Sequence, residues 1–145
     1  MVDVPPEVKI KAVLKPGAVF YFEEESLKSD EPHFFVVLNQ NPSVDVMLLM
    51  VISSSQIQKV YLRNQNNKPS ETLIEVSPTE YPDFTKNSVF DCNNVFLKTV
   101  DELIAKVSAN KLKLKSNISS ELLNRLRNAV LASPSVPPSQ KRILE

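Results

Sequence analysis

One histidine and a run of three serines are the residues of this 145-residue chain best suited to chemistry. His33 is the only histidine, and an imidazole can take or give a proton near neutral pH. The serines at 53–55 follow a long apolar run, at a place where a hydroxyl can donate to a bound oxygen. The plainer interpretations are a half-exposed polar residue for His33 and a strand-to-turn transition for the serines.

Glycine and cysteine are too scarce for several familiar kinds of site. Gly17 is the only glycine, which excludes the Walker loop, the dinucleotide-binding GxGxxG motif and the GxSxG nucleophile elbow. Cys92 is the only cysteine, so no disulfide can form within the chain, and we interpret it as a small core residue. A Cys/His zinc site would need carboxylates as its remaining ligands. We therefore expect no metal site and no cofactor.

Charge is distributed unevenly along the chain, although 17 basic and 17 acidic residues give a formal net charge of zero. Residues 1–100 hold nine Lys/Arg and 13 Asp/Glu, a balance of −4. Residues 101–145 hold eight and four, a balance of +4. This pattern excludes a uniformly basic nucleic-acid-binding protein but leaves room for a basic patch.

No segment of the sequence predicts insertion into a membrane. The longest apolar run covers residues 46–52, whereas a membrane-spanning helix needs about 20 residues. The first 20 residues lack the apolar stretch and cleavage pattern of a secretory leader. We therefore expect a cytoplasmic protein without membrane contact.

Apolar and aromatic runs bounded by polar turns predict a front half made of short strands. Six or seven such strands are typical of a barrel or of two packed sheets. The expected strands cover residues 19–22, 34–38, 45–53, 58–63, 71–76, 88–90 and 94–97.

Capping signals predict the helices. A capping box at residues 77–80 predicts one helical turn, and a second box at 99–102 opens a helix. Ser119 or Ser120 caps a longer helix with an apolar stripe that ends near residue 131. We expect residues 1–15 to form an N-terminal extension, 16–133 to form the folded domain, and 134–145 to form a proline-rich, irregular tail.

Basic residues gather in the back of the chain. Lys111, Lys113 and Lys115 alternate with leucines, which places three lysines on one face of a strand. Such a row protects a sheet edge or follows a nucleic-acid backbone, and the first interpretation is favoured. Arg125 and Arg127 are expected on a solvated face of the last long helix.

The order of these parts resembles one known family. Gly17-Ala-Val-Phe-Tyr-Phe is followed by an acidic loop, by His33-Phe-Phe-Val-Val-Leu-Asn39 and by the run at 47–55. Ser88-Val-Phe-Asp-Cys-Asn-Asn-Val, a capped helix and a Ser-Ser-Glu-Leu-Leu helix come next. Over residues 15–133 this pattern is similar to the MazF/PemK-like toxins of type II toxin–antitoxin systems.

The resemblance implies a fold, an activity and partners. The fold would be α+β and mainly β, a small SH3-like barrel with a short helix and a C-terminal helix, usually a homodimer. The activity would be metal-independent cleavage of single-stranded RNA, restrained by an antitoxin protein. Family members place an arginine followed by proline before the second strand, where this chain has Pro32 and then His33. They place threonine or serine at the end of the third strand, which here implies Ser53 and Ser54.

RNA cleavage without a metal uses the 2′-hydroxyl as the nucleophile and needs a cation for the negative charge that develops on the phosphoryl group. Two alternatives remain open: an inactive barrel that binds a peptide or nucleic acid, and a dimeric interaction protein. The acidic residues that crowd the segment before His33 would repel phosphate. The candidate cations that would contact RNA are Lys28, Arg63, Lys111, Lys113 and Lys115.

Overall fold

The structure of the protein, a computed structural model, describes residues 4–27, 31–66 and 70–145. The strands in this part of the chain are β1 (Val19–Phe22), β2 (His33–Val37), β3 (Met47–Ser54), β4 (Leu73–Val76), β5 (Ser88–Asp91), β6 (Phe96–Thr99) and β7 (Leu112–Lys115). The helices are α1 (Pro6–Val13), α2 (Ile57–Arg63), α3 (Val100–Ser108), α4 (Ser120–Ala132) and α5 (Pro138–Lys141). Two short 3-10 turns are η1 (Ser70–Thr72) and η2 (Arg142–Leu144).

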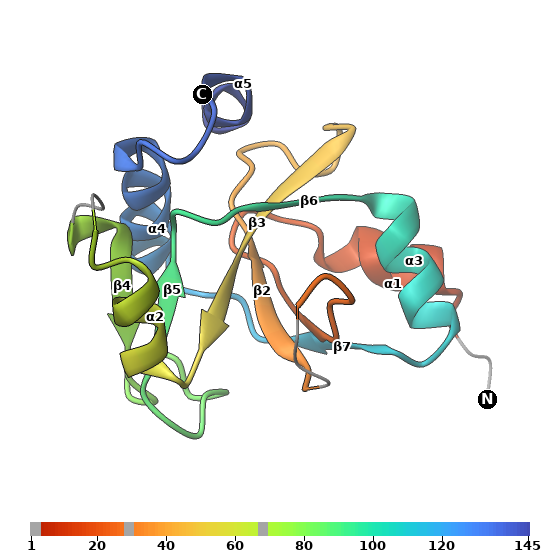
Figure 1. The fold of residues 1–145 in the computed structure, drawn as a ribbon. Coiled ribbons are helices and arrows are strands. Elements are labelled where there is room, and N and C mark those ends of the chain that lie inside the picture. The colour runs from red at the N-terminus through yellow and green to blue at the C-terminus, as the bar shows by residue number, and fades with distance from the viewer. Residues whose placement is uncertain (1–3, 28–30, 67–69) are drawn as a thin grey trace.

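The strands pair antiparallel in one strongly bent sheet, which Figure 1 shows. The strand order is β4-β5-β3-β2-β1-β7, and β6 pairs with β3 off this path. Strand β3 connects the two parts of the sheet, because it pairs with β2 as far as Ile52 and then pairs with β5 through Ser53 and Ser54. Among the described strands β4 and β7 do not pair, so the sheet is barrel-like without closing. The expected class, α+β and mainly β, is confirmed.

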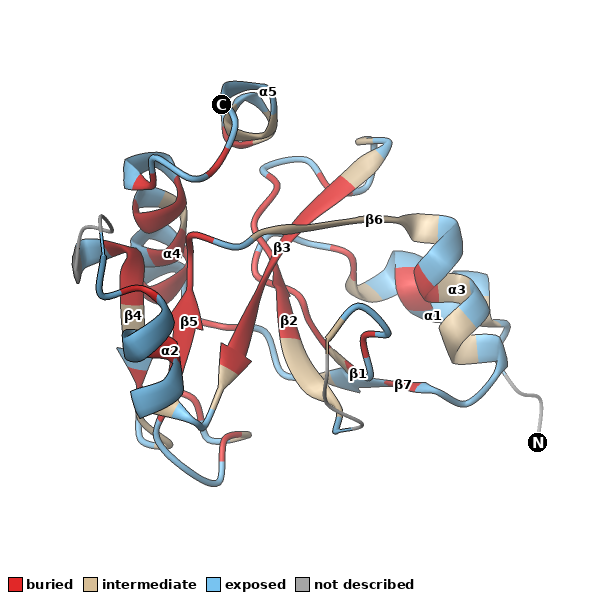
Figure 2. Cartoon of the chain, in the orientation of Figure 1, coloured by how far each residue is buried: buried red, intermediate tan, exposed pale blue. Residues whose placement is uncertain are grey.

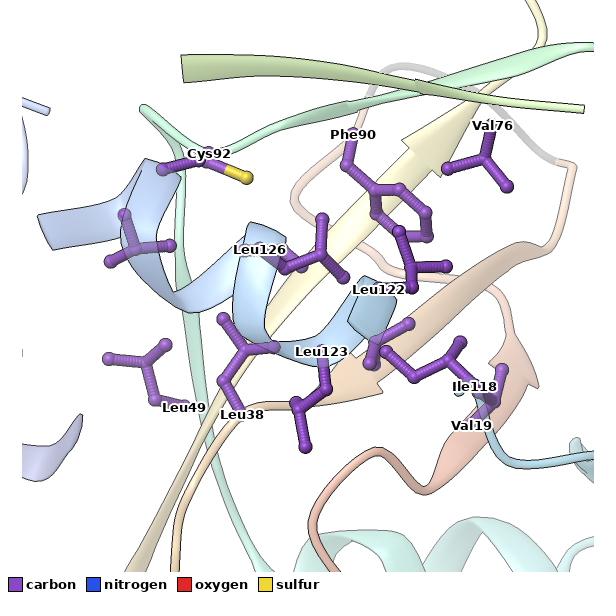
Figure 3. Close-up of a cluster of buried hydrophobic side chains, with 14 of the residues drawn as sticks. Val19, Leu38, Leu49, Val76, Phe90, Cys92, Ile118, Leu122, Leu123 and Leu126 are labelled. Atoms are coloured by element: carbon purple, nitrogen blue, oxygen red, sulfur yellow. The ribbon is translucent and has the colours of Figure 1, made fainter. Parts of the chain in front are cut away.

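Helix α4 covers one face of the sheet. Ser119 caps it, because the Ser119 hydroxyl accepts a hydrogen bond from the Leu122 backbone N–H at 3.1 Å. Leu126 is fully buried, and Figure 3 shows the helix side chains packed with Phe90 and Leu49 from the sheet. Burial of a leucine side chain stabilises a fold by about 1.5–3 kcal/mol, so this stripe fixes the helix on the sheet.

Helices α1 and α3 pack together over a second apolar cluster (Figure 1). Alternation along β1 places Val19 in the first cluster and Phe20 in the second, so the two clusters lie on opposite faces of the sheet. The capping box at Thr99 is confirmed: Thr99 Oγ1 accepts from the Glu102 N–H, and Glu102 Oε1 accepts from the Thr99 N–H. Figure 2 shows that the buried residues gather in the central strands.

Gly17 fixes the entry to β1. Its φ of 85° lies in the left-handed region, which glycine adopts without strain. Its N–H donates to the Val37 carbonyl at 2.8 Å, and its carbonyl accepts from the Ile118 N–H at 3.1 Å. A side chain at this position would meet Ile118 Cγ1 at 3.2 Å. This turn therefore joins β1 to β2 and to the segment that precedes α4.

Two expectations about local structure are wrong, and one helix was not predicted. Residues 58–63 form helix α2, because Ile57 and Val60 lie one turn apart and face inward, whereas Leu62 is exposed. The tail is not irregular, since α5 and η2 form there and Val136 and Leu144 are buried. Helix α1, in which Ile10 is fully buried, was not predicted from the sequence pattern.

The division into 1–15, 16–133 and 134–145 stays a prediction. No helix in the described ranges is long and apolar enough to cross a bilayer.

Candidate active-site cleft

A cleft of about 610 Å³ opens where β3 leaves β2 and continues beside β5. The start of β2, the end of β3, the segment 83–88 and the ends of β1 and β7 contribute to its lining. The bend of the sheet brings together residues that lie far apart in the sequence. Of the residues proposed from the sequence, the cleft lining contains His33, Ser53, Ser54, Arg63 and Lys115.

The other proposed cations are placed differently. Lys111 and Lys113 do not line the cleft, although they alternate with leucines along or beside β7 as expected. Among the described strands β7 pairs only with β1, at the end of the sheet, so its lysines lie on an edge strand. That position fits the interpretation as edge protection. Lys28 lies outside the described residues.

His33 begins β2 and is partly buried at the cleft. Its Nδ1 atom is buried and has no hydrogen-bond partner in the described part of the chain. A buried polar atom without a partner loses its hydration and gains nothing in return, so such atoms are rare outside sites where a ligand or a proton-transfer partner completes the bond. His33 is the only side chain of the described residues with such an atom.

The three serines take different positions at the end of β3. Ser53 is buried and pairs with Phe90 of β5. The Ser54 hydroxyl accepts a hydrogen bond from the Gln56 N–H at 3.1 Å, so Ser54 shapes the turn into α2. Ser55 is exposed at the cleft. The strand-to-turn interpretation therefore describes Ser54, and the sheet holds the backbone of Ser53 at the point where β3 changes partner.

Arg63 is held at the β5 side of the cleft by a carboxylate. Its Nε donates to Asp91 Oδ2 at 3.1 Å, and its Nη2 lies 3.1 Å from the same oxygen. The Arg63 side chain is 52% exposed, whereas the Asp91 side chain is 1% exposed. The guanidinium is therefore anchored from inside the protein and open to solvent on its other side.

Two lysines add positive charge to the lining. Lys115 Nζ lies over the ring of Tyr21, 5.2 Å from its centroid, and 5.9 Å from the centroid of Phe34. Lys86 was missed from the sequence because it lies in an irregular segment before β5, where no pattern marked it. Within the described residues neither lysine forms an ion pair with a carboxylate. Both ammonium groups can therefore attract an anion.

Asp83 and Tyr81 anchor the end of β7 beside the cleft. Asp83 Oδ2 accepts from the Ser116 N–H at 2.9 Å, and this bond, with the Tyr81 hydroxyl and the charge of Lys115, holds the pKa of Asp83 below its usual range. The Tyr81 hydroxyl donates to the Ser116 carbonyl at 2.6 Å. Burial, and then the charge of Asp83, raise the pKa of Tyr81, so it remains protonated.

Metal-binding clusters and a reactive thiol are the other kinds of site to consider. No group of three or more His, Cys, Asp or Glu side chains could hold a metal ion within the described ranges. Cys92 is buried, as expected, and burial followed by the charge of Asp91 raises the pKa of its thiol. The cleft thus offers an imidazole, a serine hydroxyl and three cationic side chains, a set suited to proton transfer beside a bound anion.

The fold and cleft define a small α+β protein with one bent antiparallel sheet and a site at the point where the central strand changes partner. No protein-family model matches the chain, and no curated protein matches its sequence. The fold is similar to that of an endoribonuclease in complex with its cognate antitoxin from mycobacterial species, with a TM-score of 0.52. The two sequences are 9% identical, and the match covers 85% of this chain and 96% of that chain. At this identity the likeness shows the fold alone.

Proposed function

We propose that this protein is a toxin-type endoribonuclease similar to the MazF/PemK toxins, which cleaves single-stranded RNA in the cleft without a metal or other cofactor. One observation carries the proposal: His33, whose buried Nδ1 has no hydrogen-bond partner among the described residues, shares one cleft with Arg63, Lys86 and Lys115. The fold supports the same proposal, because it is similar to that of an endoribonuclease. The roles of individual residues follow from chemistry.

His33 is the proposed general base. Its imidazole takes the proton of a 2′-hydroxyl, the 2′-oxygen attacks the adjacent phosphorus, and the bond to the 5′-oxygen breaks. The departing 5′-oxygen takes a proton from solvent. The products are a 2′,3′-cyclic phosphate on one fragment and a 5′-hydroxyl on the other. A base of this kind contributes about 10²–10⁴-fold to the rate.

Ser53, Ser54 and the cations are the proposed groups that stabilise the phosphoryl oxygens. A hydroxyl at the end of β3 donates to a non-bridging oxygen; the Ser54 hydroxyl accepts from the Gln56 N–H and keeps its own O–H for such a bond. The positive charges of Arg63 and Lys115 offset the negative charge that develops on the phosphoryl group. Glu31 and Asp83 also line the cleft.

The partners are part of the same proposal. The endoribonuclease with the similar fold is bound to its cognate antitoxin, and we propose an antitoxin protein as a partner of this chain. A homodimer and a cytoplasmic location are proposed on the family resemblance. If the cleft binds RNA but does not cut it, the protein is instead an inactive barrel that serves as a binding module.

The test is an RNA cleavage assay in the presence of a chelator. Wild-type protein should cut a mixed-sequence single-stranded RNA, and His33→Ala should lower the rate by about 10²–10⁴-fold. Lys111→Gln, outside the cleft lining, is the matched control and should cut like wild type. Intact RNA with wild-type protein would overturn the proposed activity. Wild-type cleavage by His33→Ala would overturn the role of the imidazole.

A further inference from the structure

The cations of the cleft differ in how firmly the protein holds them. Among the described residues Arg63 alone of the three forms an ion pair, and its partner Asp91 is almost fully buried. Lys115 rests on aromatic rings, and Lys86 is exposed. A guanidinium donates through a rigid planar fork, so contact along one edge fixes the direction of the other N–H groups.

Asp91 is itself fixed by donors on several sides. Its Oδ2 accepts from Asn64 Nδ2 at 3.1 Å and from Asn94 Nδ2 at 2.8 Å, in addition to Arg63. Its Oδ1 accepts from the Asn93 N–H at 3.1 Å. The carboxylate at the end of β5 therefore has hydrogen bonds to both oxygens and little freedom to turn.

The network extends beyond the cleft into the fold. Asn93 Nδ2 donates to Asn64 Oδ1 at 3.1 Å and to Thr72 Oγ1 at 2.8 Å. The Ser133 hydroxyl, at the end of α4, donates to Asn93 Oδ1 at 2.6 Å. These buried bonds join β5 to α2, η1 and α4, so the position of Asp91 is set by four separate elements. Such a network is more rigid than a surface ion pair, which exchanges its partners freely.

We infer that Asp91 is a positioning residue, which holds the Arg63 guanidinium at the β5 wall of the cleft so that its free N–H groups bind a phosphate of the RNA. This inference rests on the proposed function of the cleft. Asp91 itself is buried and does not touch the substrate. No described residue bonds to the Nη1 group of Arg63, which leaves that group for the anion. The bound phosphate then meets N–H groups whose orientation is fixed before binding.

A double-mutant cycle separates positioning from a merely structural role. Asp91→Asn should lower kcat/KM for RNA cleavage by about 10-fold or more, because Arg63 is no longer held in place. In an Arg63→Ala background the same change should have no further effect on cleavage, although it should lower the thermal midpoint in both backgrounds. Equal losses of kcat/KM in the two backgrounds would overturn the inference.

Glu80→Gln is the matched control. Glu80 Oε2 pairs with Arg125 Nη1 at 3.1 Å, which is also an arginine–carboxylate contact but lies at the surface, and neither residue lines the cleft. Cleavage by Glu80→Gln should equal that of wild type. If Asp91→Asn does not fold, Arg63→Lys keeps the test, because an ammonium cannot reproduce the planar contact. Arg63→Lys should fold and cut RNA more slowly, and wild-type cleavage by this variant would contradict the inference.

A second readout does not depend on activity. The Nε–H of Arg63, observed by NMR in the intact protein, should exchange with solvent more slowly than that of the exposed Arg142 in η2. The Arg63 exchange rate should rise in Asp91→Asn. If wild-type protein fails to cut RNA but this protection is present, the proposed function falls and the positioning of Arg63 stands. Rapid exchange in wild type would overturn the positioning whatever the activity.

Discussion

Arg125 and Arg127 on α4 lie two residues apart and make different contacts. Arg125 is exposed and pairs with Glu80, in line with the expected solvated face. Arg127 is half-buried, so the same expectation is wrong for it. Its Nε donates to the Leu38 carbonyl at 2.7 Å and its Nη2 to the Asn39 carbonyl at 3.0 Å. Burial lowers the pKa of Arg127, but the guanidinium remains charged at neutral pH.

These contacts predict a difference in stability between two matched variants. Arg127→Met should lower the free energy of unfolding by about 2 kcal/mol, because two carbonyls at the end of β2 lose a charged donor. Arg125→Met should change it by less than about 1 kcal/mol, as is typical of an exposed ion pair. Urea denaturation of both variants measures this difference. Equal losses would contradict the role of Arg127.

The residues of the cleft show which parts of a site a sequence can predict. Residue type marked His33, the place after an apolar run and the family resemblance marked Ser53, and alternation with leucines marked Lys115; all three line the cleft. Asp91 and Lys86 could not be found in this way. Their importance depends on which strands are neighbours, and the crossing of β3 from β2 to β5 is set by packing over the whole sheet.

At the scale of elements, sequence patterns predicted a helix or strand correctly where the pattern fitted only one of the two. A capping box predicted α3, a serine cap and an apolar stripe predicted α4, and apolar alternation predicted most of the strands. The prediction for residues 58–63 was wrong because a run of six residues with two aliphatic positions, Val60 and Leu62, fits a strand as well as a helix. Helix α1 was not predicted because its buried face forms only where the helix packs against α3, and the two helices lie far apart in the sequence.

The segment that follows β1 is anchored by an ion pair that should titrate in acid. Lys98 Nζ lies 2.8 Å from Glu24 Oε1, and the Ser26 hydroxyl donates to Glu24 Oε2 at 2.7 Å. Burial alone would raise the pKa of Glu24, but these bonds and the charge of Lys98 lower it below its usual value. Folding therefore disfavours protonation of this carboxyl, and its contribution to stability is present at neutral pH.

This contribution should be lost as the pH falls from the unfolded-state pKa of Glu24 through its lower folded-state pKa. The free energy of unfolding of wild-type protein should decline over that acid range. Glu24→Gln should be less stable at pH 7 and should decline less steeply, and Lys98→Gln should behave in the same way. Urea denaturation at a series of pH values tests this. Equal acid slopes for Glu24→Gln and wild type would show that the ion pair does not stabilise the fold.

At the scale of the whole molecule, net neutrality conceals a local positive charge. The balance of +4 lies in residues 101–145, but only Lys115 of its lysines lines the cleft. Binding of RNA should therefore depend on a few cations rather than on overall charge. Each phosphate contact contributes about 0.7 to the slope of log affinity against log salt for a single strand.

Substitution of one lysine should reveal this dependence. Lys115→Gln should weaken binding of a 2′-O-methyl RNA, which cannot be cut, and should reduce the salt slope by about 0.7. Lys111→Gln should have a smaller effect on both quantities, because Lys111 lies outside the lining. Fluorescence anisotropy at several salt concentrations measures affinity and slope. Identical slopes for Lys115→Gln and wild type would exclude a phosphate contact at Lys115.

The most direct measurement of the proposed activity compares two strands of the same sequence in a chelator. Wild-type protein should cut the single-stranded RNA and leave 2′,3′-cyclic phosphate and 5′-hydroxyl ends, because the 2′-hydroxyl is the nucleophile. It should leave the 2′-deoxy strand intact, and His33→Ala should cut the RNA about 10²–10⁴-fold more slowly than wild type. An RNA that survives wild-type protein, or a deoxy strand cut equally well, would contradict the account.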